Sequence, residues 1–279
     1  MISFADKYGQ WALVTGGSTG IGLALAKQAA SYGMNIILVA KRAELLAQAQ
    51  EAIQGIYKVK VIIIALDLTA DAALDKLFYE TKNLEVGMLV PNAGIELNGL
   101  FINTSLEANR KLLRLNSEVP MALSHHYGRM MAARNKGAIL FVSSGFGYQA
   151  TPYIANYAAT KAYILALGEA LNVELKEYGI DVTVLSPGLT KTSMTDDSTI
   201  NFKKLPVLSM APAMVARIGF KALGRKASVI AGFLNKFYVW QNRLVPRSVP
   251  IKLFGMLVQR AIKPEKRVEL LCISAGARS

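Results

Sequence analysis

The chain turns sharply at Thr15-Gly16-Gly17-Ser18-Thr19-Gly20-Ile21-Gly22, between an apolar run at 11–15 and a helical pattern at 20–32. Glycines allow the backbone to turn tightly and to approach an anion closely. A helix that starts directly after such a turn offers unpaired N–H groups and a partial positive charge to that anion. The segment therefore predicts a phosphate-binding turn between the first strand and the first helix of a βαβ unit.

Apolar runs of strand length alternate with helical patterns along the rest of the chain. The runs cover 34–40, 59–66, 86–90, 138–143 and 180–186, and a seventh strand is possible at 227–231. Helical patterns cover 42–54, 71–82, 106–134 and 157–178. Most runs are apolar throughout, which is typical of parallel strands buried on both faces. The expected fold is α/β, with a single doubly wound parallel sheet of the Rossmann type in one domain over residues 1–232.

Composition excludes several classes of protein. The 279 residues are 52% hydrophobic and include one cysteine, so neither a disordered chain nor a disulfide scaffold is expected. No apolar run reaches the length of a membrane-spanning helix, and the first ten residues lack the pattern of a signal peptide. We therefore expect a cytoplasmic protein.

Positive charge is concentrated in the C-terminal part. The whole chain carries a net charge of +13, and twelve basic against two acidic residues follow position 220. Residues 233–279 are interpreted as a basic helical extension of the same unit, with short helices at 233–244 and 251–262. The second is amphipathic, with a basic polar face and a broad apolar face. Three uses stay open for this extension: a lid over the substrate, a subunit contact, or peripheral contact with the anionic inner surface of a membrane.

The turn at residues 15–22 resembles the fingerprint of the short-chain dehydrogenase/reductase (SDR) family, Thr-Gly-x3-Gly-x-Gly. The resemblance covers about residues 9–232. Pro91-Asn92-Ala93-Gly94 is similar to the family's Asn-Asn-Ala-Gly, with proline in the first place, and 187–192 is similar to its Pro-Gly-x3-Thr segment. The resemblance implies a nicotinamide dinucleotide cofactor. The residues implied to bind it are Gly16, Ser18, Thr19, Gly20, Ile21, Gly22, Lys41, Arg42, Asp67, Leu68, Asn92, Ala93, Gly94, Tyr157, Lys161, Pro187, Gly188 and Thr192.

Tyr157 and Lys161 lie one helical turn apart and so share a helix face. Ser144 precedes the tyrosine by the 13 positions that the SDR family uses, and Asn116 matches the fourth member of the family's catalytic set. A phenol ionises near pH 10, and a nearby ammonium lowers that pKa toward the working pH. The expected roles are Tyr157 as acid/base, Lys161 as the group that lowers its pKa, and Ser144 as a donor to the substrate oxygen. The resemblance implies that Lys161 also binds the ribose of the nicotinamide. By the resemblance, Asn116 holds a water that relays protons through the lysine.

The choice between the two nicotinamide cofactors depends on the end of the second expected strand. Members that use NAD place an acid there, whereas this chain has Lys41 and Arg42 and no acid before Glu44. Two cations suit a 2′-phosphate, which arginine can bind with two hydrogen bonds. The sequence favours NADP(H), with NAD(H) possible, and hence the reductive direction.

The substrate and the partners are less defined. Apolar side chains after the Pro-Gly segment indicate a lipophilic carbonyl or alcohol; they are Leu205, Val207, Leu208, Met210 and Met214. The resemblance implies a homodimer or homotetramer through 106–134 and 157–178. No cluster with the spacing of a metal site and no nucleic-acid-binding motif is found.

The expected function is that of an NADP(H)-dependent oxidoreductase, which reduces a carbonyl to an alcohol, or the reverse, by hydride transfer with Tyr157 as acid/base. Two other functions are alternatives. An extended-type epimerase or dehydratase shares Tyr-x3-Lys but usually carries Thr-Gly-x2-Gly-x2-Gly, which is absent here. A catalytically idle NADP(H) sensor or a membrane-associated scaffold, acting through the basic tail, is the remaining alternative. The intact set of Ser144, Tyr157 and Lys161 argues against it.

Overall fold

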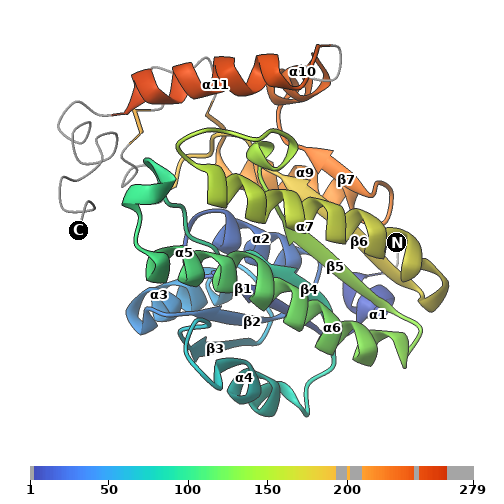
Figure 1. Ribbon diagram of the computed structural model, residues 1–279. Coiled ribbons are helices and arrows are strands. Elements are labelled where there is room, and N and C mark those ends of the chain that lie inside the picture. The colour runs from blue at the N-terminus through green and yellow to red at the C-terminus, as the bar shows by residue number, and fades with distance from the viewer. Residues whose placement is uncertain (1–2, 193–199, 202–208, 242–244, 263–279) are drawn as a thin grey trace.

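The computed structural model describes residues 3–192, 200–201, 209–241 and 245–262, and Figure 1 shows their arrangement. Seven parallel strands form one sheet in the order β3-β2-β1-β4-β5-β6-β7. Their bounds are β1 Trp11–Thr15, β2 Asn35–Ala40, β3 Val61–Ala65, β4 Val86–Pro91, β5 Gly137–Val142, β6 Ile180–Ser186 and β7 Ser228–Ile230. The order reverses between β1 and β4, and ligands of doubly wound sheets bind in the crevice at such a switch point. The predicted sheet, with its seventh strand, is confirmed.

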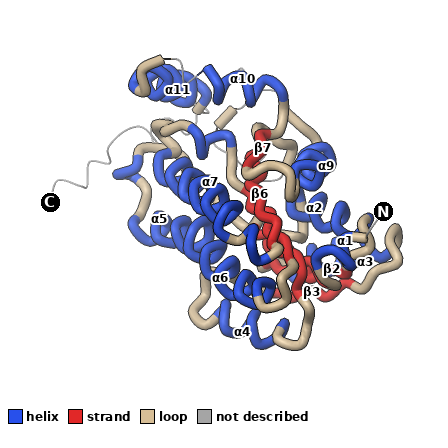
Figure 2. Tube along the Cα trace, turned by 90° about the vertical axis from the view of Figure 1, so that its right-hand side faces the viewer, coloured by secondary structure: helices blue, strands red, loops and turns tan. Residues whose placement is uncertain are grey.

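Helices cover both faces of the sheet, as Figure 2 shows. One face carries α2 (Gly20–Ser31), α3 (Ala43–Gln54) and α9 (Pro212–Ala222), and the other carries α4 (Ala73–Thr81), α5 (Leu106–Leu113), α6 (Val119–Ala132) and α7 (Ala155–Glu174). Side chains alternate between the two cores: Ala12 and Val14 pack beneath the first layer, and Leu13 packs beneath the second. Because both faces are covered, the strands are apolar throughout, which is the pattern seen in the sequence.

The single helix expected at 106–134 is divided by a π-helical turn at Arg114–Glu118. Pro120, near the start of α6, explains this break. Proline has no N–H to donate to the carbonyl of Asn116, and its ring collides with that carbonyl in an α-helix. A wider turn accommodates one additional residue and keeps the two helices nearly continuous.

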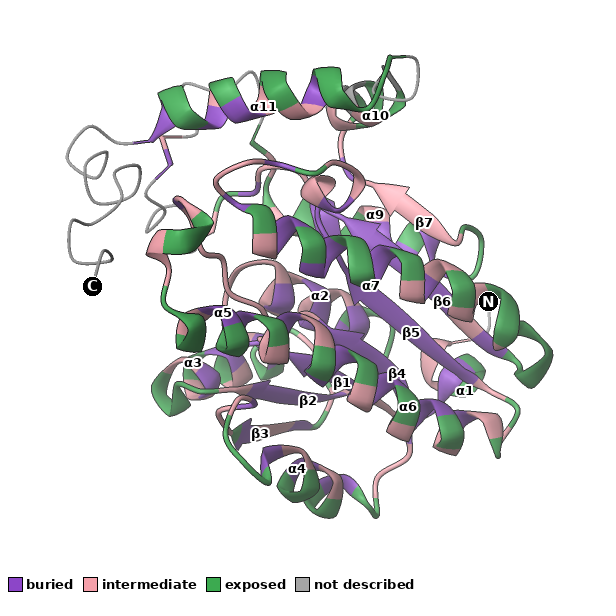
Figure 3. Cartoon of the chain, in the orientation of Figure 1, coloured by how far each residue is buried: buried purple, intermediate pink, exposed green. Residues whose placement is uncertain are grey.

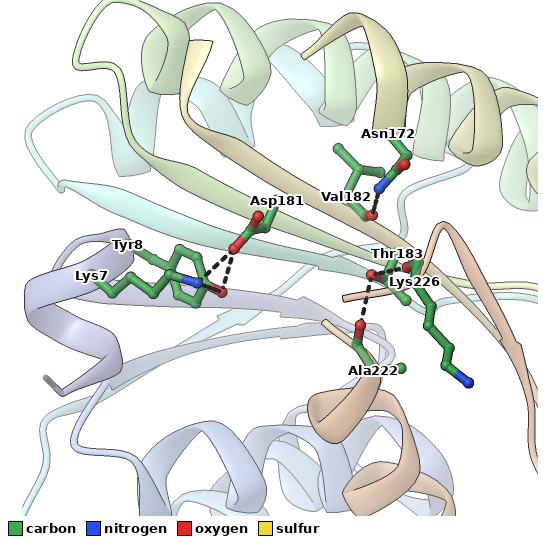
Figure 4. Close-up of polar contacts among 8 residues, drawn as sticks. All are labelled: Lys7, Tyr8, Asn172, Asp181, Val182, Thr183, Ala222 and Lys226. Carbon is green, nitrogen blue, oxygen red and sulfur yellow. Dashed lines mark hydrogen bonds and ion pairs between the residues drawn. The ribbon is translucent and has the colours of Figure 1, made fainter. Parts of the chain in front are cut away.

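A short N-terminal helix, α1 (Phe4–Tyr8), was not expected, and Figure 4 shows how polar contacts hold it on the sheet. Tyr8 is buried, and its hydroxyl donates to Asp181 at 2.8 Å, while Lys7 pairs with the same carboxylate at 2.7 Å. Asn172 and Thr183 make further bonds to backbone carbonyls beside this point. Asp181 is the second residue of β6, so this cluster holds α1 at the amino ends of the strands, away from the carboxyl edge of the sheet.

Two C-terminal helices, α10 (Phe233–Gln241) and α11 (Ser248–Ala261), lie along one end of the molecule beyond α7 and β7 (Figure 1). The inner side of α11 packs on the body: Val258 and Ala261 are buried with Ile154, and a Cβ on Gly255 would lie 2.9 Å from Pro152. Leu253, part of the broad apolar face at 251–262, is 49% exposed. The helix thus has apolar residues on both sides, and Figure 3 shows in green the exposed positions on its outer side. Residues 263–279 of the basic extension lie outside the described residues.

In the part of the chain that is described, no helix has both the length and the apolar character needed to cross a membrane.

Candidate active site

The glycine turn (residues 15–22) links β1 to α2 at the switch point. Gly16 and Gly20 have φ angles of +63° and +57°, which side chains with a Cβ rarely adopt. Thr19 is the N-cap of α2, and its side chain makes no capping hydrogen bond. The first amides of α2 therefore remain available to an anion, and the turn fits the pyrophosphate of a dinucleotide.

The loop after β4 lies against the glycine turn. The side-chain amide of Asn92 donates to the carbonyls of Thr15 and Gly16 at 3.0 and 3.3 Å. The Thr15 hydroxyl accepts the backbone N–H groups of Asn92 and Ala93, both at 3.0 Å. Pro91, which replaces the first Asn of the family motif, is the last residue of β4 and pairs with Thr15. Asn92 therefore joins the loop after β4 to the glycine turn.

Asn116 lies in the π-helical turn and is almost fully buried. Its side chain accepts the N–H of Ile95 and donates to the carbonyl of Ile95, both at 2.9 Å, and it also donates to Thr160 at 3.3 Å. The side chain thus joins the loop after β4 to α7, the helix that carries Tyr157 and Lys161.

Ser144, Tyr157 and Lys161 meet at the carboxyl edge of β5. Ser144 follows the end of β5, and its hydroxyl hydrogen-bonds with Tyr157 in the first turn of α7. The Lys161 ammonium lies 5.6 Å from the centroid of the tyrosine ring and donates to the carbonyl of Val142 at 3.2 Å. All three side chains are buried. The arrangement presents a hydroxyl, a phenol and an amine together, which is the set needed to polarise and protonate a substrate oxygen.

Burial governs the pKa values of Tyr157 and Lys161. Burial raises the pKa of Tyr157 above the usual value of a phenol, and the carboxylate of Glu96 raises it further, while the Ser144 hydrogen bond acts in the opposite direction. Burial also lowers the pKa of Lys161 to about 8. Removal from water sets the direction of this shift, and the lowering of the Tyr157 pKa by Lys161 stays a prediction.

The adenosine side of the site combines an ion pair and an exposed arginine. Lys41 pairs with Asp67 at 2.9 Å, and the Thr69 hydroxyl and Lys41 hold the pKa of that carboxyl well below its usual range. Arg42 is the N-cap of α3, is exposed, and makes no capping bond with its side chain. Leu68 is buried directly behind Asp67. Of the two predicted cations, Arg42 is therefore the better placed for a phosphate at the start of α3.

The Pro-Gly segment after β6 closes over the glycine turn. The carbonyl of Pro187 accepts the N–H of Gly145, next to Ser144. A Cβ on Gly20 would lie 3.0 Å from the Thr192 methyl group, and a Cβ on Gly188 would collide with Asn235 of α10. This segment thus lies between the glycine turn, the Ser144 loop and the C-terminal helices.

Of the apolar residues after the Pro-Gly segment that indicate a lipophilic substrate, the structure describes Met210 and Met214. Leu205, Val207 and Leu208 lie outside the described residues. Met210 is partly buried and forms an isolated β-bridge with Thr190, whereas Met214 on α9 is 55% exposed.

Sequence reasoning missed three polar contributors. Thr15 and Thr160 hold Asn92 and Asn116 through hydroxyls that no motif marks. Glu96 acts electrostatically on both Tyr157 and Lys161. An acidic residue two positions after the Asn-Ala-Gly motif, in an otherwise uncharged loop, was the available signal.

Residues 10–201 match the family model described as short chain dehydrogenase. The chain is 31% identical over 256 residues to a 7beta-hydroxysteroid dehydrogenase of Clostridium sardiniense, covering 92% of this chain and 98% of that protein. It is 36% identical over 222 residues to a very-long-chain 3-oxoacyl-CoA reductase-like protein of Arabidopsis thaliana, covering 76% and 71%. A solved structure from a study of 7beta-hydroxysteroid dehydrogenase stereoselectivity superimposes with a TM-score of 0.84 at 28% identity, covering 91% of this chain and 99% of that one.

Proposed function

The chain belongs to the short-chain dehydrogenase family, an NAD(P)-dependent oxidoreductase family acting on CH–OH groups, and we propose that this member reduces a lipophilic carbonyl compound with NADPH. The observation that carries the proposal is the meeting of Ser144, Tyr157 and Lys161 beside the glycine turn. An idle sensor or scaffold would not need these three buried polar side chains in one place.

NADPH, when bound, supplies the hydride that is added to the carbonyl carbon. Ser144 donates a hydrogen bond to the carbonyl oxygen and polarises it. Tyr157 gives its proton to the same oxygen as negative charge develops there, and the phenol regains a proton from solvent. Burial keeps this phenol protonated near neutral pH, which is the form that reduction requires. Lys161 supplies positive charge beside the phenol and, as in the family, binds the nicotinamide ribose.

The preference for NADPH over NADH depends on the start of α3. Arg42 is exposed there, no ion pair of its guanidinium is found among the described residues, and the α3 amides add a partial positive charge. A guanidinium binds a phosphate bidentately, whereas the ribose hydroxyls of NADH offer it no charge.

The substrate class is inferred from the relatives and from the C-terminal helices. The relatives are named for steroid and very-long-chain acyl substrates. In this chain, α11 covers the loop between Ser144 and Tyr157 through the contact of Gly255 with Pro152. A cover of apolar helices suits a substrate with a large apolar body.

The outer surface of α10 and α11 further supports contact with an anionic membrane. Phe233 is 84% exposed, Trp240 58%, Val249 51% and Met256 51%. On α11, Val249, Leu253 and Met256 lie within about 100° of one another around the helix axis. Lys252 lies next to them on the same helix. Aromatic and aliphatic groups bordered by cations favour the interface of an anionic bilayer, where each cation contributes about 1 kcal/mol.

The reaction is tested by following NADPH oxidation with steroid ketones and 3-oxoacyl thioesters. Tyr157→Phe should lower kcat by about 10²–10⁴-fold with little change in NADPH binding. Tyr163→Phe removes an identical hydroxyl from an exposed position on the same helix and should be neutral. Near-normal turnover by Tyr157→Phe would overturn the assigned chemistry.

The membrane contact is tested with the full chain by co-sedimentation with vesicles. We expect binding to anionic but not neutral vesicles, with loss at high salt. Exchanging Leu253 and Met256 for Glu should abolish the binding, whereas Val173→Glu, at a 73% exposed site on α7, should not. Absence of binding at low salt would refute the contact.

A further inference from the structure

Asn235, the third residue of α10, contacts the Pro-Gly segment (residues 187–192) of the cofactor site. A Cβ on Gly188 would collide with the side-chain amide of Asn235 and lie 2.6 Å from its Cγ atom. The φ angle of Gly188 is not positive, so the backbone conformation does not require glycine at this position. The absence of a Cβ here allows the close approach of Asn235.

The side chain of Asn235 is held in place by the chain that follows β7. Its Nδ2 atom donates a hydrogen bond to the carbonyl of Ala231 at 2.7 Å. A Cβ on Gly232 would lie 2.9 Å from the same Nδ2 atom and 3.1 Å from the sulfur of Met210, so this side of the asparagine is also closely packed. Because Nδ2 is also the atom nearest to Gly188, the side chain cannot turn away from Gly188 without losing its hydrogen bond.

The Pro-Gly segment is also attached on either side of Gly188. Before it, the carbonyl of Pro187 accepts the N–H of Gly145 at 2.8 Å. After it, the carbonyl of Leu189 accepts the N–H of Met210 at 2.9 Å. The asparagine contact lies between these two hydrogen bonds and links the segment to α10.

The Pro-Gly segment lies at the end of the site where hydride would be transferred. Ser144 and Tyr157 act on the carbonyl oxygen in the proposed reaction, so the nicotinamide ring has to lie beside them. The hydrogen bond from Gly145 places Pro187 next to Ser144, whereas β2 and β3, with the adenosine side of the site, lie across β1 from this place. A segment that is already ordered loses less conformational freedom when a ligand binds, so its supports contribute to affinity.

We propose that Asn235 is a positioning residue through which α10 holds the Pro-Gly segment in place for the nicotinamide half of the cofactor. The inference rests on the proposed function. It extends the cofactor site to a helix that lies outside the match to the family model, which ends at residue 201. Asn235 does not act on the reacting atoms in this role, because its effect passes through Gly188.

The first test compares two ligands of the full chain by titration calorimetry. NADPH occupies both halves of the site, whereas adenosine 2′,5′-bisphosphate carries the 2′-phosphate but no nicotinamide. Asn235→Ala should raise the Kd for NADPH about three- to tenfold and leave the Kd for the bisphosphate unchanged. A general loosening of the protein would weaken the binding of both ligands.

Asn172→Ala is the matched control, because it also removes a side-chain amide that donates to a backbone carbonyl, that of Val182 at 2.6 Å (Figure 4). It lies near the C-terminal end of α7 and should leave both Kd values unchanged. If Asn235→Ala leaves the Kd for NADPH unchanged, or weakens both ligands equally, the inference fails and the proposed function is unaffected. If the wild type binds neither ligand, the proposed function fails and the inference fails with it.

The second test needs no cofactor and measures the contact itself by thermal unfolding. Gly188→Ala should lower the Tm by about 2–4 °C, because the added methyl group displaces the amide of Asn235. When both positions are alanine, the space left by the amide accommodates that methyl group, so this double variant should melt no lower than Asn235→Ala alone. If the two decreases in Tm simply add, the two residues do not contact each other and the inference is refuted.

Discussion

Gly22→Ala tests whether the glycine turn must come as close to its neighbours as the structure shows. Gly22 is the third residue of α2, and a Cβ there would lie 2.1 Å from the carbonyl oxygen of Gly16 and 2.5 Å from the Asn92 amide. Contacts of real Cβ atoms start at about 3.0 Å, so the turn or the helix must move by roughly 1 Å. The turn is not free to yield, because Gly16 is bonded to Val39 at 2.8 Å and accepts from Asn92.

We expect two measurable effects of Gly22→Ala. Overpacking of this kind costs about 1–3 kcal/mol, offset by about 0.5–1 kcal/mol from the better helix propensity of alanine. A displaced turn also loses at least one charge-assisted bond to the pyrophosphate, worth about 1.5–3 kcal/mol, so the Kd for NADPH should rise roughly tenfold or more. Thermal unfolding and isothermal titration measure the two effects.

Gly128→Ala is the matched control, because a Cβ on this α6 glycine meets nothing within 4 Å. It should be neutral or stabilising by about 0.5–1 kcal/mol and leave the Kd unchanged. If Gly22→Ala binds NADPH normally and unfolds no earlier than Gly128→Ala, the close approach is not required and the reasoning is refuted.

Three further predictions follow from contacts away from this turn. Arg42→Ala should raise the Kd for NADPH about tenfold or more and leave the Kd for NADH unchanged. Lys41→Ala should have a smaller effect, because this lysine is paired with Asp67. Equal losses of affinity for both cofactors, measured by titration calorimetry, would contradict the 2′-phosphate role. Tyr8→Phe should lower the free energy of unfolding in urea by about 1–2 kcal/mol, through loss of the 2.8 Å bond to Asp181, and should not change kcat, because the pair lies at the opposite edge of the sheet; a fall in kcat would show the opposite. Lys161 has a pKa of about 8 in the folded protein, against an ordinary value of 10.5. Between pH 8 and 10 the unfolded chain therefore binds more protons, and the free energy of unfolding should rise with pH by up to about 1.4 kcal/mol per pH unit. If the free energies of unfolding of wild type and Lys161→Met differ by a constant amount across this range, the prediction is contradicted.

The sheet could be predicted because its signals are local. Each strand is an apolar run buried on both faces, and the glycine turn marks the first βα connection. Spacing alone was also enough to put Tyr157 and Lys161 on one helix face and Ser144 at the edge of the sheet. The break in the helix at Asn116 was missed because the apolar pattern continues across it, although Pro120 was a visible reason for it.

Contacts between distant segments could not be predicted from local signals. The pKa of Tyr157 depends on burial and on Glu96, which is 61 positions earlier in the chain, and no motif links the two. Lys41, which is expected at a phosphate, also pairs with Asp67 from the loop after β3, and no local signal indicated this pair. Leu253 could not be assigned a side, because apolar residues surround most of α11 and only the packed structure shows which of them are covered.

The π-helical turn at Arg114–Glu118 constrains how the chain can change in length. Removing one residue there would restore an α-helix and rotate α5 by about 100° relative to α6. The α5 contact of Asn109 with Asn156 and the burial of Leu123 and Tyr127 on α6 could then not be kept together. Deletions and insertions should therefore be absent from this segment in homologous proteins that stay folded, even where most side chains differ. The length of the segment should thus be retained in evolution for longer than its amino-acid sequence.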